Sequence, residues 1–222
     1  MSRNSRLNFS DWIMLFDDRA DAGRRLARAL DDYRGQQPLV LAIPRAAVPI
    51  GRVVAEALGG DLDVVLVRKL GAPYNPEFAV GSVGESGHVM VADYAERAGV
   101  DSRYLTEEAA RQLATIRQRR MQYDQVHTPV NPAGRTVIVV DDGLATGSTM
   151  CAALQEVRAQ KPARLICAVP VASRDAVMRV RPLCDDVICL AIEADFGGVG
   201  QFYRDFRQVE DDDVLMMLKA CQ

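Results

Sequence analysis

The sequence predicts an α/β fold in which a mainly parallel central sheet has helices on both faces. First, short apolar segments alternate with segments whose apolar residues recur at helical spacing, the order of strand and helix in such folds. Second, residues 137–140 are four consecutive β-branched apolar residues, which suit a strand covered on both faces. Third, 49 % of the 222 residues are hydrophobic, enough for a substantial core. We therefore expect a single domain over residues 1–222.

The first expected element is a helix that Asp17 or Asp18 caps and that runs to about Tyr33. Leu26 and Leu30 belong to an apolar stripe at helical spacing along it. The next elements alternate, with strands expected at 39–43, 62–67, 136–141, 164–169 and 187–191 and helices at 48–58, 147–160 and 173–180.

Residues 71–132 interrupt this alternation and form an expected insertion. It begins with turn-forming residues at 72–77, which we expect to be mobile. Strand-like segments at 78–83 and 88–92 then predict a β-hairpin. This hairpin is expected to contribute either to a lid or to surface contacts between subunits.

A strongly charged helix is expected over 106–125, with Thr106 as its cap. Its acids come early and its arginines late, which suits the helix dipole. We interpret the arginines as a solvated face: Arg111, Arg117, Arg119 and Arg120.

The carboxyl-terminal residues 193–222 are expected to form a small unit with a last helix. Residues 196–206 concentrate aromatic side chains and glycines, although only 6 % of the chain is aromatic. Asp211 is expected to cap the helix at 212–220.

Polar residues directly follow the strand at 136–141 and predict a ribose-phosphate site. The strand leads into Asp141 and Asp142, at the edge where open α/β sheets bind their ligands. Two adjacent acids there need polar partners, such as sugar hydroxyls or a hydrated Mg²⁺. Hydroxyl groups and backbone N–H groups at the start of the next helix favour a phosphate. This loop consists of Gly143, Leu144, Ala145, Thr146, Gly147, Ser148 and Thr149.

The order of apolar strand, two acids and hydroxyl-rich loop resembles the 5-phosphoribosyl 1-pyrophosphate (PRPP) motif of type I phosphoribosyltransferases. The strand at 39–43 ends in Pro44-Arg45-Ala46-Ala47, which resembles the pyrophosphate loop of that family. Arg68 and Lys69 follow the strand at 62–67 and bring two cations to the same edge. From Phe16 to Phe206 the chain is similar to a subgroup of stand-alone members whose acceptor is unassigned.

This resemblance implies Mg²⁺-dependent transfer of a phosphoribosyl group from PRPP to a nitrogenous, base-like acceptor, with release of pyrophosphate. Asp141 and Asp142 would hold the ribose hydroxyls and Mg²⁺, directly or through water, and residues 143–149 would bind the 5′-phosphate. The predicted diphosphate-binding residues are Arg45, Ala46, Ala47, Arg68 and Lys69. The predicted catalytic residues are Arg45, Arg68, Lys69, Asp141 and Asp142.

The resemblance also suggests an acceptor site, a lid and a homodimer. In the family a small hood over the sheet edge holds the acceptor, so Phe196, Phe202 and Tyr203 are candidates for stacking on it. Residues 71–90 correspond to a flexible loop that closes over the active site.

The acceptor and the catalytic base stay open. Purine-salvage members often have an acid at the position of Ala145, which cannot move a proton, so a 6-oxopurine is disfavoured. The other candidate bases are Glu77, Glu85 and Asp205.

Two alternatives to the transferase are a non-catalytic protein that senses PRPP or a nucleotide, and a phosphohydrolase of a ribose phosphate. Ala46, Ala47 and Ala145 favour the sensor. A transcriptional regulator of that kind would need a DNA-binding segment, which we do not find.

Composition argues against nucleic-acid and membrane partners. The net charge is −3 and the pI is about 5.5, whereas nucleic-acid binding favours a basic face. Residues 1–10 lack the apolar run of a signal peptide, and no uncharged apolar segment of membrane-spanning length occurs. We expect a cytoplasmic protein.

Overall fold

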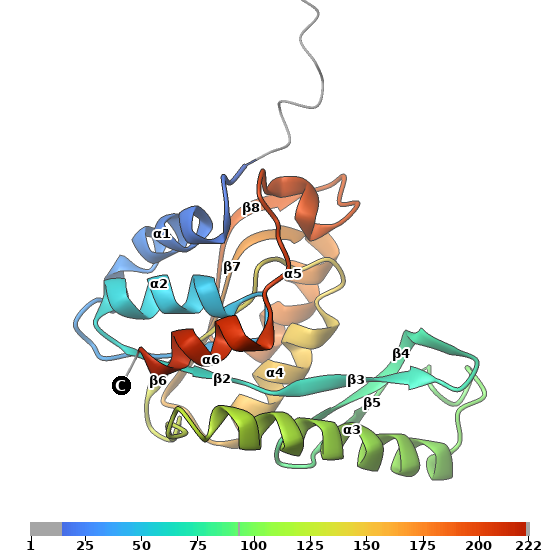
Figure 1. The fold of residues 1–222 in the computed structure, drawn as a ribbon. Helices are drawn as coiled ribbons and strands as arrows, with labels where there is room; N and C mark the ends of the chain where they lie inside the picture. Colours follow the sequence, from blue (N-terminus) through green and yellow to red (C-terminus); the bar gives the residue numbers. More distant parts are fainter. Residues whose placement is uncertain (1–14, 93, 221–222) are drawn as a thin grey trace, which may run out of the picture.

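The computed structural model describes residues 15–92 and 94–220, without the side chain of Glu77 (Figure 1). Its main sheet has five parallel strands in the order β2-β1-β6-β7-β8. The parallel sheet expected from the sequence is therefore confirmed. The strand bounds are β1 Leu39–Ala42, β2 Asp61–Val64, β6 Thr136–Val140, β7 Arg164–Ser173 and β8 Asp186–Glu193.

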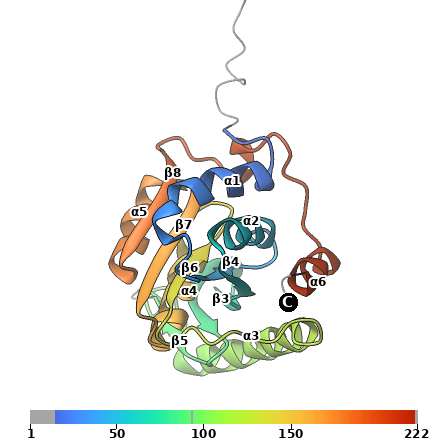
Figure 2. The same cartoon turned by 90° about the vertical axis from the view of Figure 1, so that its left-hand side faces the viewer.

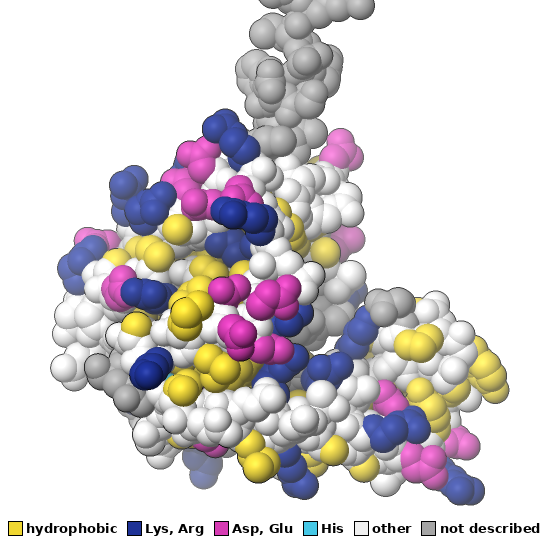
Figure 3. Space-filling view, in the orientation of Figure 1, with side chains coloured by type: hydrophobic (Ala, Val, Ile, Leu, Met, Phe, Trp, Pro, Cys, Tyr) yellow, Lys and Arg dark blue, Asp and Glu magenta, His cyan; other side chains and the backbone are white. Residues whose placement is uncertain are grey.

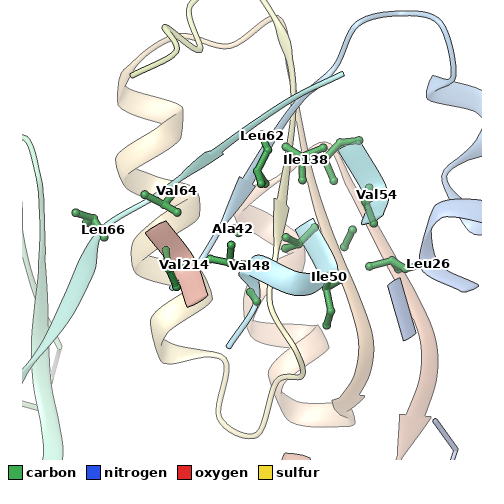
Figure 4. Close-up of a cluster of buried hydrophobic side chains, with 14 of the residues drawn as sticks. Leu26, Ala42, Val48, Ile50, Val54, Leu62, Val64, Leu66, Ile138 and Val214 are labelled. Atoms are coloured by element: carbon green, nitrogen blue, oxygen red, sulfur yellow. The ribbon is translucent and has the colours of Figure 1, made fainter. Parts of the chain in front are cut away.

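Helices cover both faces of this sheet, as expected. Figure 2 shows α1 (Arg19–Ala29) and α2 (Val48–Leu58) on one side of the strands and α5 (Arg174–Val180) on the other, where α4 (Ser148–Ala159) also packs. Because side chains alternate along a strand, Ile138 faces α1 and α2 while Val139 faces α4 and α5. Figure 4 shows part of the hydrophobic cluster on the α1 and α2 side of the sheet, including Leu26, Ala42, Ile50, Val54 and Ile138.

The start of α1 is also confirmed. Asp18 caps the helix, because its carboxylate accepts a hydrogen bond from Asp21 N at 2.7 Å. The α-helix ends at Ala29, and a 3₁₀ turn, η2 (Asp31–Tyr33), completes the expected segment.

The expected strand at 62–67 is wrong at its carboxyl end. Strand β2 stops at Val64, and the chain passes into a second, antiparallel sheet of order β3-β4-β5. Leu66 N donates to the Glu85 carboxylate of the hairpin, which takes the backbone away from the main sheet. The expected hairpin exists, but a third strand precedes it: β3 Val67–Ala72, β4 Asn75–Gly84 and β5 Val89–Val91.

Helix α3 (Ser102–Tyr123) starts earlier than expected, because Asp101 caps it by accepting a hydrogen bond from Tyr104 N at 2.7 Å. Thr106, the expected cap, lies inside the helix, and its hydroxyl donates to Ser102 O. The cap was wrongly placed because Thr106 and Asp101 both precede helix-forming residues.

Arg120 joins α3 to the hairpin, which corrects the interpretation of this arginine as solvated. Its side chain is 16 % exposed and donates to both oxygens of Glu85 at 2.7 Å, and it also contacts Asp63 at 3.3 Å. On the other side of the same turn, Ser86 donates through N and Oγ to Glu156 of α4 at 2.9 and 2.6 Å. The hairpin turn is thus fixed to two helices.

The carboxyl-terminal part pairs with the start of the described chain. Phe16 N donates to Phe202 O and Arg204 N donates to Phe16 O, both at 2.9 Å. Glu210 caps the last helix in a capping box with Asp213, where Asp211 was the expected cap. The remaining elements are η3 Arg181–Leu183, η4 Val199–Phe202 and α6 Asp211–Lys219. Within residues 15–92 and 94–220, no helix is both long and apolar enough to span a bilayer.

Replacing Arg120 by Met should destabilise the protein, because it removes the only arginine paired with Asp63 among the described residues; the Asp63 side chain is 4 % exposed and would keep only the more distant His127 at 3.8 Å. We expect urea unfolding to show a loss of about 3 kcal/mol. The matched control on the same helix is Arg103→Met, since the Arg103 and Glu107 side chains are 87 % and 56 % exposed and their pair should contribute less than about 1 kcal/mol. Equal losses in the two variants would contradict this role of Arg120.

Candidate functional site

The second of the two adjacent acids after β6, Asp142, is paired with an arginine of the protein. Asp142 is 7 % exposed, and its Oδ2 accepts hydrogen bonds from Arg19 Nε at 3.2 Å and Nη2 at 3.0 Å. Tyr203 OH donates to the Asp142 carbonyl at 2.7 Å. Asp142 is therefore held in a buried ion pair, and that pairing limits its part in binding the ribose hydroxyls or a metal.

Arg19 was missed as a site residue, although the segment that contains it supported the family resemblance. It donates through Nη1 to Arg207 O at 2.7 Å, and its guanidinium carbon lies 3.9 Å from the ring centroid of Phe206. Arg19 thus connects α1, the sheet edge and the carboxyl-terminal segment. No local pattern distinguishes it from the other arginines of α1.

Asp141 is half-buried and faces a different environment from Asp142. Its Oδ1 accepts a hydrogen bond from Asp142 N at 2.9 Å. Burial, and then the charge of Asp142, raise the pKa of Asp141 well above its ordinary value. Burial also raises the pKa of Asp142, against the lowering effect of Arg19. Asp141 is consequently a carboxylate that a hydroxyl or cation would stabilise.

Asp141 and Asp142 could hold Mg²⁺ only if water and a substrate supplied its remaining ligands. The described residues contain no cluster of three His, Cys, Asp or Glu side chains that could hold a metal. Mg²⁺ commonly takes one or two carboxylates and completes its octahedron with waters and phosphate oxygens. Asp141 suits such an arrangement better than Asp142, whose Oδ2 binds Arg19.

The loop at 143–149 is held against β7. Leu144 N donates to Val171 O and Ser173 N donates to Leu144 O, both at 2.9 Å, and the Leu144 side chain is buried. A side chain on Gly143 would come within 2.7 Å of Val199, so a residue without Cβ is needed there. Gly143 and Leu144 therefore act as buried spacers, which leaves the later residues of the loop for a ligand.

The second half of the loop presents hydroxyls at the start of α4. Gly147 has φ +74°, in the left-handed region, and is the residue before the first helical turn. Thr146 Oγ1 lies 3.2 Å from Ser148 Oγ. Thr146 and Thr149 are exposed and Ser148 is half-buried. Ser148 N donates to Thr146 Oγ1 at 3.4 Å, so this arrangement offers mainly hydroxyl donors to an anion at the positive end of a helix.

The loop at 44–47 brings Arg45 to the neighbouring strand end. The Pro44–Arg45 peptide bond is cis. Arg45 Nη1 lies 3.2 Å from Glu210 Oε2 and 3.6 Å from Asp211 Oδ2. The Ala47 N–H, expected to face a diphosphate, instead donates to Ile43 O at 3.3 Å, so Ala46 is the better candidate.

Two adjoining cavities share Pro44, Arg68 and Arg119. The first, of about 580 Å³, has four arginines in its wall; the second, of about 670 Å³, lies between β3 and α3 and includes Lys69 and Thr149. Asp141 and Asp142 line neither cavity, and Asp142 is joined to the first one through Arg19. The arginines of the first cavity are Arg19, Arg45, Arg68 and Arg119.

Arg68 and Lys69 reach these cavities from inside β3, and not from the end of a strand in the main sheet. Arg68 is half-buried, and its Nε donates to Gln112 Oε1 of α3. Lys69 is exposed. The structure therefore gathers the predicted cations, although by a different route from the expected one.

Two of the three expected acceptor-stacking residues are buried in the core, and the third, Phe196, is half-buried. Phe202 and Tyr203 are buried and pack in the core with Phe16, and Phe196 contacts the Phe202 ring at 4.9 Å. Phe206, in the same aromatic segment, is 37 % exposed and lines the first cavity. The sequence did not single out Phe206, because a short irregular segment has no periodic pattern that separates buried from exposed aromatic residues.

The candidate bases receive no support from their positions. Arg120 binds both oxygens of Glu85, and Arg207 Nε contacts both oxygens of Asp205 at 3.0 and 2.9 Å. The side chain of Glu77 lies outside the described part of the chain.

Comparison with known proteins places the chain in a family. Residues 12–207 match the model of the phosphoribosyl transferase domain. A Mycobacterium tuberculosis (strain H37Rv) protein, "Putative phosphoribosyl transferase Rv0571c", is 40 % identical over 207 residues, which are 93 % of this chain and 47 % of that protein. The chain thus spans about half the length of the curated relatives it matches.

Solved structures agree with the fold. The crystal structure of TT1426 from Thermus thermophilus is 47 % identical, with a TM-score of 0.83 over 94 % of this chain and 99 % of that chain. The AQ2163 protein from Aquifex aeolicus is 13 % identical, with a TM-score of 0.50 over 84 % of this chain and 85 % of that chain, and shows likeness of fold alone. The chain belongs to the phosphoribosyl transferase domain family.

Proposed function

We propose that this protein is a Mg²⁺-dependent phosphoribosyltransferase that transfers the phosphoribosyl group of PRPP to a nitrogenous, base-like acceptor and releases pyrophosphate. The main support is the cavity whose wall contains four arginines and which adjoins the cavity of Thr149. A phosphorylated sugar diphosphate needs cations for the diphosphate and hydroxyl and N–H donors for its 5′-phosphate. Both kinds of donor meet at this edge of the sheet.

The proposed reaction breaks the bond between the anomeric carbon and the diphosphate oxygen, and the acceptor nitrogen forms the new bond to that carbon. Positive charge develops on the sugar ring and negative charge on the leaving diphosphate. Arg45, Arg68 and Lys69, which line the two cavities, would stabilise the leaving group. Residues 146–149 would hold the 5′-phosphate, and Asp141 would accept hydrogen bonds from the ribose hydroxyls.

Mg²⁺ would be held by Asp141, directly or through water, together with oxygens of PRPP. When bound, it would neutralise charge on the diphosphate and so make it a better leaving group. We assign Asp142 a different task, which is to fix Arg19 and the backbone of the loop.

The acceptor would bind beside Phe206 and Gln208, which line the first cavity together with Arg45. Phe206 offers an aromatic ring and Gln208 an amide that can both donate and accept hydrogen bonds. A lid role for residues 71–90 and a homodimer are further proposals, which the family resemblance supports. A single domain is a proposal that the length and the hydrophobic content of the chain support.

An assay of pyrophosphate release tests the reaction. With PRPP, Mg²⁺ and pooled bases, we expect base-dependent release that falls at least about tenfold in Arg45→Gln, since one charge-assisted contact to the leaving group is lost. Arg28→Gln, on the exposed side of α1, is the matched control and should keep full activity. Tight PRPP binding without release would support a sensor instead, and release without any base would indicate a phosphohydrolase.

Asp141→Asn should stabilise the protein while weakening PRPP binding, because the pKa of Asp141 is raised in the folded state. A carboxyl group with a raised folded pKa lowers stability as pH rises from its unfolded value, about 3.9, to its folded one. The variant avoids this loss, so we expect its melting temperature to exceed that of the wild type by about 2 °C or more at pH 7.5 and the difference to shrink towards pH 4.

Asp32→Asn, an exposed site in η2, controls for a general effect of removing negative charge. Calorimetric titration should show PRPP affinity at least about tenfold weaker in Asp141→Asn, since a charged hydrogen-bond acceptor is lost. A variant that is less stable than the wild type at pH 7.5, or that binds PRPP equally well, would contradict the role of Asp141.

A further inference from the structure

We infer that Arg119 of α3 is an additional diphosphate-binding residue and that Asp211 of α6 competes with the diphosphate for it. This inference rests on the proposed use of PRPP. It concerns an arginine that we had interpreted from the sequence as part of a solvated helix face.

Arg119 lies where the two cavities meet. It lines both of them, together with Pro44 and Arg68, and so stands between the Arg45 loop and the cavity that contains Thr149. Its side chain is 29 % exposed, whereas Arg117 on the same helix is exposed and lines neither cavity. A ligand that extends from the phosphate loop towards Arg45 would therefore pass Arg119.

The ion pair between Arg119 and Asp211 is long. Arg119 Nη2 lies 3.8 Å from Asp211 Oδ1, which is too long for a hydrogen bond. Asp211 Oδ1 and Tyr123 OH are buried beside each other and interact, but neither makes a well-formed hydrogen bond to a described residue. The adjacent Arg120, by contrast, makes short hydrogen bonds to Glu85 and Val64 O. Arg119 thus keeps donor capacity that its present partner does not use.

The same acid also faces Arg45. Asp211 Oδ2 lies 3.6 Å from Arg45 Nη1, so one carboxylate stands between two arginines of the first cavity. Figure 3 shows acidic side chains gathered at the start of α6 with basic side chains beside them; the acids of the first turn and its cap are Glu210, Asp211, Asp212 and Asp213.

A diphosphate would replace this carboxylate with a better partner. It has more charge and more acceptor oxygens than one carboxylate, and its oxygens can accept parallel hydrogen bonds from a guanidinium. The Asp211 contacts are long and partly exposed, so they contribute little to stability and are easily exchanged. Ligand binding would then release Asp211 from Arg45 and Arg119, while the contact of Arg45 with Glu210 at 3.2 Å can stay and Val214 and Leu218 keep the helix on the core.

The test is calorimetric titration of inorganic pyrophosphate, with Mg²⁺, into the wild type and the variants of the full chain. We expect at least about fivefold weaker binding in Arg119→Gln and at least about threefold stronger binding in Asp211→Asn. Arg117→Gln is the matched control on the same helix and should bind like the wild type. In the double variant Arg119→Gln/Asp211→Asn, the gain from Asp211→Asn should be largely lost. Ribose 5-phosphate, which lacks the diphosphate, should bind Arg119→Gln and the wild type equally well.

Thermal melting establishes first that each variant is folded, and Asp211→Asn provides a test that does not depend on Arg119→Gln. Unchanged pyrophosphate affinity in both Arg119→Gln and Asp211→Asn, with normal PRPP binding by the wild type, would overturn this inference and leave the proposed function intact. Absence of PRPP binding by the wild type would overturn the proposed function and this inference with it.

Discussion

The buried ion pair between Arg19 and Asp142 is the interaction on which the geometry of the site depends. A carboxylate at the end of a buried strand needs a cation, and Arg19 supplies it at 3.0 Å. Arg19 also binds Arg207 O and stacks on Phe206, so it joins α1 and the carboxyl-terminal segment to the sheet edge. The backbone pairing of Phe16 with Phe202 holds both ends of this connection in place.

Because Arg19 pairs with Asp142, the two adjacent acids have different environments. Asp142 is neutralised by the protein itself, and Tyr203 fixes its carbonyl. Burial and the charge of Asp142 raise the pKa of Asp141, so a hydroxyl or a cation of the proposed substrate complex would stabilise the charged form of Asp141. The cations show the same division, since Arg120 is committed to Glu85 and Asp63 whereas Arg119 faces the cavities.

Much of the main sheet could be predicted from the sequence, because residues 137–140 and the regular strand-helix alternation are local patterns. The end of β2 at Val64 could not, since residues 65–67 are still apolar and the group that Leu66 N binds, the Glu85 carboxylate, lies in a distant part of the sequence. The same holds at the site. The acids and the loop after β6 are contiguous in sequence, but Arg19 lies 123 positions before its partner Asp142. Phe202 is buried and Phe206 is 37 % exposed, and this difference arises from the way in which the irregular segment packs on the core.

A double-mutant cycle on Arg19 and Asp142 tests the central claim most directly. The free energy of unfolding would be measured in urea for the wild type, Arg19→Met, Asp142→Asn and the double variant. Each single change leaves the other polar group buried without its partner, so we predict a coupling energy of about 2 kcal/mol or more, with the double variant losing far less than the sum. Losses that add within about 0.5 kcal/mol would show that the two residues act independently and would contradict the account.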